Sequence, residues 1–240
     1  MPNNSTSDMK LSGIVENDLR FVWHPFTAQP ANPPVNIVSA QGLYYVDEHG
    51  KKYIDAISSW WVNLHGHSHP HIVNAIAEQA SKNAHSIFSG FTHPSAVVLA
   101  ERILQLLPRK MDKVFFSDDG STAVEVGIKM AVQYFENRGL RKPGIIALEN
   151  AYHGDTFGSM SVGARNVFTQ AFSQLLFSVN HLPVPTKENK SSSIELLNRL
   201  LSIGDIGIFI FEPLVQGAGG MKMYEAELLS EMIRLKRQED

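Results

Sequence analysis

The chain has 240 residues, a formal net charge of -3 at pH 7 and no cysteine. This length allows one large domain or two small ones, and the lack of cysteine excludes disulfides, thiolate metal sites and a cysteine nucleophile. Acidic and basic residues are well mixed, so no basic patch argues for nucleic acid, and no run of about 18 apolar residues indicates a membrane span. The first ten residues are polar and lack the apolar core of a signal peptide, so we expect a cytoplasmic protein.

The N-terminal part of the chain predicts a small antiparallel sheet. Residues 1 to about 18 are rich in Asn, Ser and Asp, which is typical of a mobile tail. The aromatic cluster 21–27 is too short, and too interrupted by Pro25, to form a helix. After the break at Pro33, three short segments alternate like strands, and a turn signal at 47–50 precedes the last of them. We therefore expect an antiparallel meander of residues 35–38, 43–46 and 52–54.

Two adjacent tryptophans, Trp60 and Trp61, precede a run of histidines at alternate positions. If the tryptophans lie on a strand, their side chains face opposite ways, so one can fill a core while the other faces a pocket. The histidines make a metal site conceivable, because imidazole is a common metal ligand. However, Gly66 and Pro70 interrupt the strand pattern and no carboxylate has a familiar ligand spacing, so we expect no metal. The histidines at positions 65, 67, 69 and 71 instead lead into a predicted helix through Ile72, Ile76 and Ala80.

The pattern of residues 114–135 is that of a strand, a polar turn and a helix. Residues 114–116 form a short apolar run that predicts a buried strand. Thr122 and Glu125 have the spacing of a capping box, so we expect the helix to begin there, with backbone N–H groups pointing into the turn. Gly120 and the hydroxyl of Ser121 make this turn suitable for a phosphate. From these residues alone, a capped helix without a ligand is the preferred interpretation, since the P-loop and dinucleotide motifs are both lacking.

The remaining patterns predict alternating helices and buried strands. The predicted strand, helix and next strand should form a parallel unit with a right-handed crossover. Ligands bind at the carboxyl ends of parallel strands, so the loop 149–156 should lie beside the Gly120 turn. Residues 183–193 predict a surface loop, and the glycine-rich stretch 212–220 predicts a plain turn rather than a second phosphate site. Further helices are expected at 94–107, 194–201 and 228–235, and the helix after the Gly120 turn should run to Arg138, with Gly139 as its C-cap. Further buried strands are expected at 144–148 and 206–211.

Several motifs of this sequence resemble those of the class III aminotransferases, and the resemblance runs from Arg20 to the last residue. The Gly-Ser and Glu-Pro motifs are shared by the whole class, whereas the Trp-His-Pro and Ser-Ser-Trp-Trp stretches are more similar to the biotin-synthesis branch of the class. The motifs are Trp23-His24-Pro25-Phe26-Thr27, Ser58-Ser59-Trp60-Trp61, Asp119-Gly120-Ser121, Tyr152 to Gly158 and Glu212 to Met221.

The resemblance implies the fold of fold type I transferases that depend on pyridoxal 5'-phosphate (PLP), in a homodimer. This is an α/β fold with a mostly parallel sheet, flanking helices and a small antiparallel N-terminal segment. Residues 1–65 would then contribute to the small domain and the substrate pocket. Residues 66–240 would form the first part of the large PLP-binding domain, the rest of which lies beyond the end of this chain.

The resemblance also implies roles for the residues around the central turn. Gly120 and Ser121 would bind the phosphate of PLP. Tyr152 would lie over the pyridine ring and contact substrate, where an aromatic side chain suits a flat cofactor. Asp155 and Glu212 would support the cofactor.

Two aromatic residues of the N-terminal segment are implied to contact substrate. Trp60 would line the pocket for an aliphatic chain, whereas a place in the core suits Trp61 better. Phe26 occupies a position where some members of the class carry a tyrosine whose hydroxyl helps to recognise the substrate. This difference leaves the amino donor open between S-adenosylmethionine and lysine.

The implied activity is amino transfer, with S-adenosylmethionine as the preferred donor, to 8-amino-7-oxononanoate, giving 7,8-diaminononanoate in biotin biosynthesis. The Schiff-base lysine and the aspartate that pairs with the pyridine nitrogen are both expected beyond Asp240. We therefore expect no catalytic residue within this chain and no activity of the chain alone. The alternatives are another class III ω-aminotransferase, or a non-catalytic fragment or module.

Overall fold

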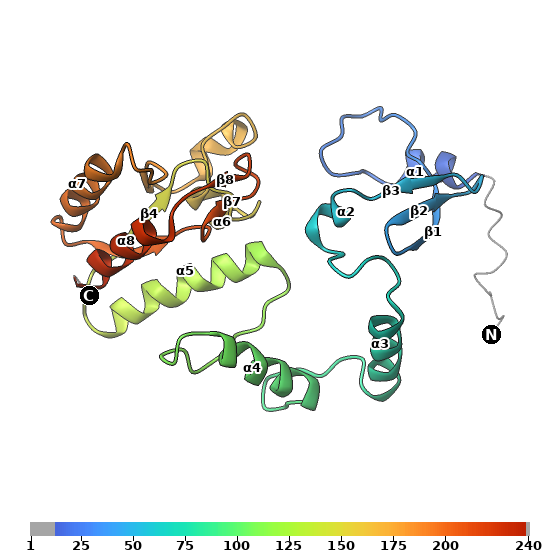
Figure 1. Ribbon diagram of the computed structural model, residues 1–240, viewed down its shortest axis with the longest axis horizontal. Helices are drawn as coiled ribbons and strands as arrows, with labels where there is room; N and C mark the ends of the chain where they lie inside the picture. The colour runs from blue at the N-terminus through green and yellow to red at the C-terminus, as the bar shows by residue number, and fades with distance from the viewer. Residues whose placement is uncertain (1–12, 239–240) are drawn as a thin grey trace. The chain divides into compact units, whose positions relative to one another are not determined.

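A computed structural model describes residues 13–238 of the chain (Figure 1). The chain separates into two compact units, one ending at Arg102 and the other beginning at Ile103. The division into residues 1–65 and 66–240 that the resemblance implies refers to domains of a complete enzyme, and it stays a prediction.

The first unit contains the predicted antiparallel meander, a three-stranded sheet in the order β1-β2-β3. Its turn between β2 and β3 is held by the buried carboxylate of Asp47, which accepts hydrogen bonds from the N–H groups of His49 and Lys51 at 2.9 and 2.8 Å. Gly50 completes this turn with a φ of 78°, a value that favours glycine. The elements are α1 (Ile14–Phe21), β1 (Ile37–Gln41), β2 (Tyr44–Asp47), β3 (Lys52–Ile54), α2 (Ser58–Trp61), α3 (Pro70–Lys82) and α4 (Pro94–Leu106), the last of which crosses the boundary between the units.

The prediction of a mobile tail up to about residue 18 is wrong for its last part, because α1 begins at Ile14. Glu16 lies in the first turn of this helix and Arg20 in its last turn, an arrangement that complements the helix dipole. Residues 1–12 lie outside the described residues. The predicted helices beginning at Pro70 and Pro94 are confirmed.

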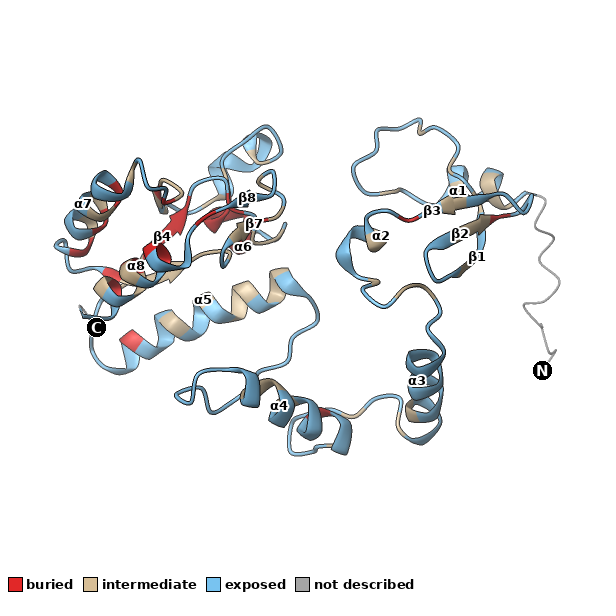
Figure 2. Ribbon diagram, viewed as in Figure 1, coloured by how far each residue is buried: buried red, intermediate tan, exposed pale blue. Residues whose placement is uncertain are grey.

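The second unit is built on a parallel three-stranded sheet in the order β5-β4-β6. Side chains from the sheet, α7 and α8 form its core, and Ile146, Leu148, Leu182, Leu197 and Met232 are fully buried. Figure 2 shows buried residues gathered on β4 and on the elements packed against it. The elements are α5 (Gly120–Asn137), β4 (Gly144–Leu148), α6 (Phe157–Val162), a 3-10 helix (Gln170–Leu175), β5 (Asn180–Leu182), α7 (Lys190–Leu201), β6 (Ile206–Ile210), β7 (Val215–Gln216), β8 (Lys222–Met223) and α8 (Ala226–Gln238).

The predicted buried strand at residues 114–116 is not formed, and Phe115 is 63% exposed. A strand needs a neighbour for its backbone hydrogen bonds. Residues 114–116 pair with none of the described strands. The predicted strands at 144–148 and 206–211 are confirmed, the second to Ile210.

The glycine-rich stretch forms the turn of the β7–β8 hairpin, as expected. Within residues 13–238, no helix is both long and apolar enough to cross a membrane.

Candidate functional site

The start of α5 is capped by Asp119 rather than by the predicted pair of Thr122 and Glu125. The N–H of Thr122 donates to Asp119 Oδ1 at 2.8 Å, and the N–H of Asp119 donates to Thr122 Oγ1 at 3.0 Å. The predicted N-cap, Thr122, is therefore wrong, and the observed N-cap, Asp119, lies three residues earlier. Aspartate is itself a preferred N-cap residue. The helix begins at Gly120, and the N–H groups of Gly120 and Ser121 have no acceptor among the described residues.

The loop after β4 lies against this helix start, as the topology predicts. The N–H of Asp155 donates to Ser121 Oγ at 3.1 Å. Gly154 makes this approach possible: its φ is 126°, and a Cβ placed there would lie 2.1 Å from Ser121 Oγ. A hydroxyl that accepts one hydrogen bond still has its own hydrogen to donate. Ser121 therefore anchors the loop and keeps a donor for an anion.

A second bridge between α5 and the loop comes from Glu125, whose role we did not predict. Its Oε1 accepts hydrogen bonds from Thr156 Oγ1 at 2.6 Å and from the N–H groups of Gly158 and Ser159 at 2.7 and 3.3 Å. These N–H groups belong to the first turn of α6, which needs acceptors from outside the helix. The sequence indicates only that the first turn of a helix needs acceptors for its N–H groups. It does not indicate that the acceptor is Glu125, more than 30 residues away.

Tyr152, Asp155 and Glu212 are brought together by direct hydrogen bonds. The hydroxyl of Tyr152 donates to Asp155 Oδ2 at 2.7 Å, and its N–H donates to Glu212 Oε2 at 3.1 Å. The bond to the Asp155 carboxylate, together with burial and the negative charge, raises the pKa of Tyr152 to about 12. The other oxygen of Glu212 accepts from the N–H of Gly217 at 3.0 Å, so this carboxylate ties the loop to the glycine-rich turn. The structure thus assembles Ser121, Tyr152, Asp155 and Glu212 around the first turn of α5.

The same loop contains a half-buried histidine, His153, that the sequence did not single out. His153 Nε2 is buried and has no hydrogen-bond partner among the described residues. Burial, and the proximity of His181, lower the pKa of His153 to about 4. The imidazole is therefore neutral at neutral pH.

We expect the second unit to lose stability as the pH falls from about 6.5 towards about 4. The unfolded chain binds a proton at His153 in this range and the folded chain does not, so each pH unit costs up to about 1.4 kcal/mol of the free energy of unfolding. Urea unfolding at pH 7 and pH 5 should show a smaller difference for His153→Gln than for the parent. His49→Gln, which removes a histidine whose side chain is 83% exposed, should retain the parental pH dependence. An identical pH dependence in the two variants would contradict this assignment.

In the first unit, Trp60 and Trp61 do not lie on a strand, the case considered from the sequence. Residues 58–61 have φ values between 49° and 72°, so α2 is a single left-handed turn. This conformation costs a non-glycine residue about 1–2 kcal/mol. Trp61 is 51% exposed rather than in a core, and Trp60 is 66% exposed. The ring of Trp60 contacts that of Phe26, with centroids 6.0 Å apart, so the two predicted substrate residues lie together.

The histidines after α2 do not form a metal centre with acidic neighbours. Among residues 13–238, no group of three or more His, Cys, Asp or Glu side chains is placed to hold a metal ion. His67 is instead bonded to Asp55, and His69 is the N-cap of α3.

The profile of the class III aminotransferase family matches residues 26–240, so this chain belongs to the class III aminotransferases. The chain is 47% identical over 220 residues to the adenosylmethionine-8-amino-7-oxononanoate aminotransferase of Synechococcus elongatus, a match that covers 88% of this chain and 52% of that enzyme. It is 38% identical to the enzyme of the same name from Geobacter sulfurreducens, covering 92% of this chain and 51% of that enzyme. The chain thus spans about half the length of the curated relatives that it matches.

Solved structures of this class confirm the predicted fold. The adenosylmethionine-8-amino-7-oxononanoate aminotransferase of Methanocaldococcus jannaschii matches with a TM-score of 0.88 at 33% identity, over 96% of this chain and 53% of that one. An ω-transaminase of Pseudomonas jessenii, solved in complex with PMP, matches with a TM-score of 0.86 at 27% identity, over 95% of this chain and 54% of that one.

Proposed function

We propose that this chain forms the cofactor-phosphate site and part of the substrate site of a PLP-dependent aminotransferase. The proposed reaction transfers an amino group from S-adenosylmethionine to 8-amino-7-oxononanoate and gives 7,8-diaminononanoate in biotin biosynthesis. The observation that carries the proposal is the first turn of α5, where Ser121 is bonded to the loop that contains Tyr152. The names of the relatives at up to 47% identity support the choice of reaction.

The first turn of α5 fits a phosphate group in three respects. The N–H groups of Gly120 and Ser121 are free of acceptors in the described chain, and they lie at the positive end of an 18-residue helix. The hydroxyl of Ser121 accepts from Asp155 and keeps its hydrogen for donation. A Cβ added at Gly120 would meet nothing within 4 Å, so there is open space at the helix end. These features support binding of the PLP phosphate by Gly120 and Ser121.

The neighbouring residues would orient the cofactor ring and the substrate. When bound, PLP supplies an electron sink for the carbanion that forms at the carbon carrying the amino group. The ring of Tyr152 would face the cofactor, and its hydroxyl is oriented by Asp155. Because its pKa is about 12, Tyr152 stays protonated at neutral pH and donates rather than accepts this proton. Glu212 holds the Tyr152 backbone in place, and we assign no catalytic lysine among residues 13–238.

Trp60 and Phe26 would contact the substrate through apolar surfaces. Both side chains are largely exposed in the described chain and are available to a ligand. Phe26 has no hydroxyl, so it offers only apolar contact, which suits the aliphatic chain of 8-amino-7-oxononanoate. A homodimer in the cytoplasm is part of this proposal.

An ω-transaminase acting on another amine is the second candidate, because the Pseudomonas jessenii enzyme has nearly the same TM-score, 0.86 against 0.88. Backbone similarity therefore does not favour either reaction. Sequence identity favours the first candidate, with 47% to a biotin-synthesis enzyme against 27% to this ω-transaminase.

An assay of the protein produced from its complete coding sequence tests the proposal. The purified protein is given PLP, 8-amino-7-oxononanoate and either S-adenosylmethionine or lysine, and 7,8-diaminononanoate is measured by mass spectrometry. Formation of product from S-adenosylmethionine is the expected result. Transfer to simple ketones but not to 8-amino-7-oxononanoate would favour the ω-transaminase instead.

We expect two substitutions at the start of α5 to weaken PLP binding. Ser121→Ala removes a hydrogen-bond donor to a charged group, an interaction worth about 1.5–3 kcal/mol, so the PLP dissociation constant should rise by at least about tenfold. Gly120→Ala puts a methyl group into the open space and should also weaken binding. The measurement is equilibrium binding of PLP by the complete protein.

The two variants separate a phosphate site from a merely structural turn. The backbone of Gly120 has no positive φ and an added Cβ meets no atom, so Gly120→Ala should leave the stability of the cofactor-free protein unchanged. If both variants bind PLP with the parental affinity, the phosphate does not lie at this turn.

A further inference from the structure

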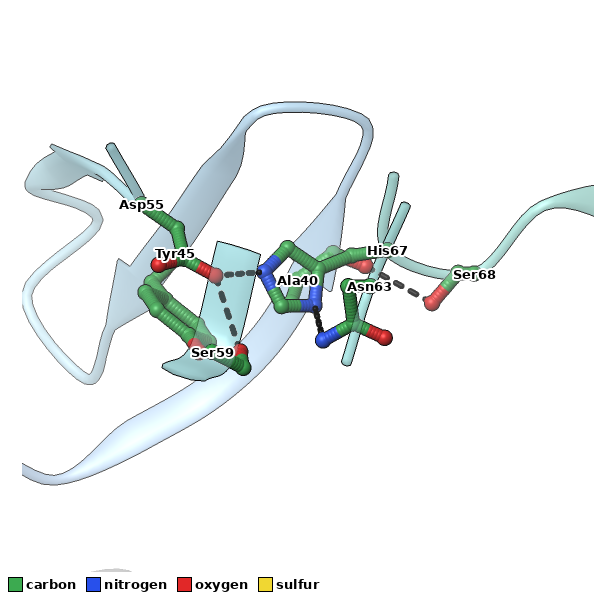
Figure 3. A network of polar contacts seen from close by, with 7 residues as sticks. All are labelled: Ala40, Tyr45, Asp55, Ser59, Asn63, His67 and Ser68. Atoms are coloured by element: carbon green, nitrogen blue, oxygen red, sulfur yellow. Dashed lines mark hydrogen bonds and ion pairs between the residues drawn. The ribbon is translucent and has the colours of Figure 1, made fainter. Parts of the chain in front are cut away.

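A network of polar side chains surrounds the buried carboxylate of Asp55 (Figure 3). Asp55 Oδ2 accepts hydrogen bonds from Ser59 Oγ and from His67 Nε2, each at 2.8 Å. Tyr45 OH is hydrogen-bonded to Ser59 Oγ, and Asn63 Nδ2 lies 3.3 Å from His67 Nδ1. Since a carboxylate only accepts, His67 must donate from Nε2.

Asp55 is charged throughout the ordinary pH range. Hydrogen bonds from the backbone and side chain of Ser59, and from His67 and Tyr45, lower the pKa of Asp55 to about 2 although burial raises it. The network therefore joins strand β2, the turn α2 and the segment before α3 through one fixed negative charge. The N–H of Asp55 donates to Leu43 O at 3.0 Å, and the backbone of His67 pairs with that of Gly42, so both ends of the network are attached to the β1–β2 hairpin.

The turn α2 needs such support, because its backbone is held in an unfavourable conformation. Ser58, Ser59, Trp60 and Trp61 are consecutive non-glycine residues with positive φ. A run of this kind persists only where the surroundings over-determine it. Ser59 is the residue of the turn whose side chain enters the network, through both Asp55 and Tyr45.

Burial of the tryptophans does not explain the unfavourable backbone, because Trp60 is 66% exposed and Trp61 is 51% exposed. The turn instead presents the Trp60 side chain outwards, against the ring of Phe26. Because the strained turn does not bury Trp60, we infer that the strain holds the Trp60 side chain in a fixed direction.

We propose that Asp55, Ser59 and His67 are positioning residues that fix the direction of the Trp60 ring and thereby set the affinity for the apolar chain of the amino acceptor. This inference rests on the proposed function, since it concerns the substrate pocket of that reaction. None of the three residues needs to touch substrate, because Ser59 acts through the backbone of the adjacent Trp60.

The kinetic test compares four variants of the complete protein: Ser59→Ala, Ser59→Gly, Ser68→Ala and Trp60→Ala. Ser59→Ala should raise the KM for 8-amino-7-oxononanoate about tenfold or more, with a smaller effect on kcat and none on the KM of the amino donor. Ser59→Gly removes the strain together with the hydroxyl, and it should raise the same KM although it folds readily. A parental KM in Ser59→Gly would mean that Ser59 serves only the stability of the turn and would overturn the proposal.

Ser68→Ala is the matched control. Ser68 also has a positive φ, of 52°, and its hydroxyl donates to Ala40 O at 2.8 Å, yet it lies outside the bonds to Asp55 (Figure 3). The KM of the Ser68→Ala variant for 8-amino-7-oxononanoate should equal that of the parent. Trp60→Ala separates the two proposals: if it leaves this KM unchanged, the assigned substrate role of Trp60 is wrong.

A spectroscopic test does not depend on activity. The protein is labelled with 5-fluorotryptophan, and the ¹⁹F resonance of Trp60 is identified by its loss in Trp60→Phe. Ser59→Ala and Asp55→Asn should shift or broaden this resonance, whereas Ser68→Ala should not. An unchanged Trp60 resonance in both network variants would overturn the positioning role, whatever the outcome of the assays.

Discussion

Gly154→Ala should detach the loop after β4 from α5 and prevent retention of PLP. The φ of Gly154 is 126°, and a Cβ there would lie 2.1 Å from Ser121 Oγ and 2.8 Å from Ser159 Oγ. The unfavourable φ costs about 1–3 kcal/mol and the overlap about 1–3 kcal/mol more, so the loop must move to relieve them. Because Asp155 follows directly, its hydrogen bond to Ser121 would be lost with the movement.

Gly139→Ala is the control for a positive φ without steric overlap. Gly139 follows α5 with a φ of 67°, and an added Cβ would meet nothing within 4 Å. Urea unfolding should show about 1–2 kcal/mol of destabilisation for Gly139→Ala and more for Gly154→Ala. Equilibrium PLP binding by the complete protein should be lost only in Gly154→Ala. Parental binding in that variant would show that the contact with Ser121 is not required.

Glu125→Ala should destabilise the second unit and release the first turn of α6. The substitution removes a carboxylate that accepts from Thr156, Gly158 and Ser159, and hydrogen bonds to charged groups are worth about 1.5–3 kcal/mol. Glu125→Gln retains an acceptor oxygen without the charge and should have a smaller effect. The free energy of unfolding in urea measures the loss.

Amide hydrogen exchange locates the effect of Glu125. The N–H groups of Gly158 and Ser159 should exchange faster in Glu125→Ala, whereas those of β4 should be protected as in the parent. Glu136→Ala removes an exposed carboxylate from the same helix and should change neither measurement. Equal exchange in the Glu125 and Glu136 variants would exclude the bridge.

The elements that could be predicted from sequence are those whose buried side chains form a helical repeat or a continuous apolar run in the sequence. The strand at Gly144–Leu148 is a continuous apolar run because the sheet is covered, and α7 repeats Leu197 and Leu201 on its buried side. The run at 114–116 is also apolar but forms no strand, because strand formation also requires a neighbour. An apolar run alone therefore predicts neither pairing nor burial, and Phe115 is 63% exposed.

The left-handed turn α2 could not be predicted by the same means. Ser and Trp have no preference for positive φ, and the conformation depends on Asp55 and His67, which lie outside the turn. Trp60 and Trp61 were considered on a strand from the sequence, whereas tertiary hydrogen bonds support a turn there.

At the candidate site, motif resemblance named the residues and topology predicted their proximity. The position of the loop beside Gly120 followed from the shared edge of parallel strands. The bonds of Glu212 to Tyr152 and of Glu125 to Thr156 join residues 60 and 31 positions apart, and no local pattern records such pairs. The missed capping residue, Asp119, was by contrast visible in the sequence as a common N-cap.

The loop after β4 is attached to α5 at two points, Ser121 and Glu125, and this affects how an anion would bind at the start of α5. These bonds, and those of Tyr152 to Asp155 and Glu212, are made between protein groups alone. An anion at the proposed phosphate site would find its donors already aligned, and little conformational entropy would be lost on binding. At the proposed phosphate site, binding of the anion would then need no rearrangement of this loop.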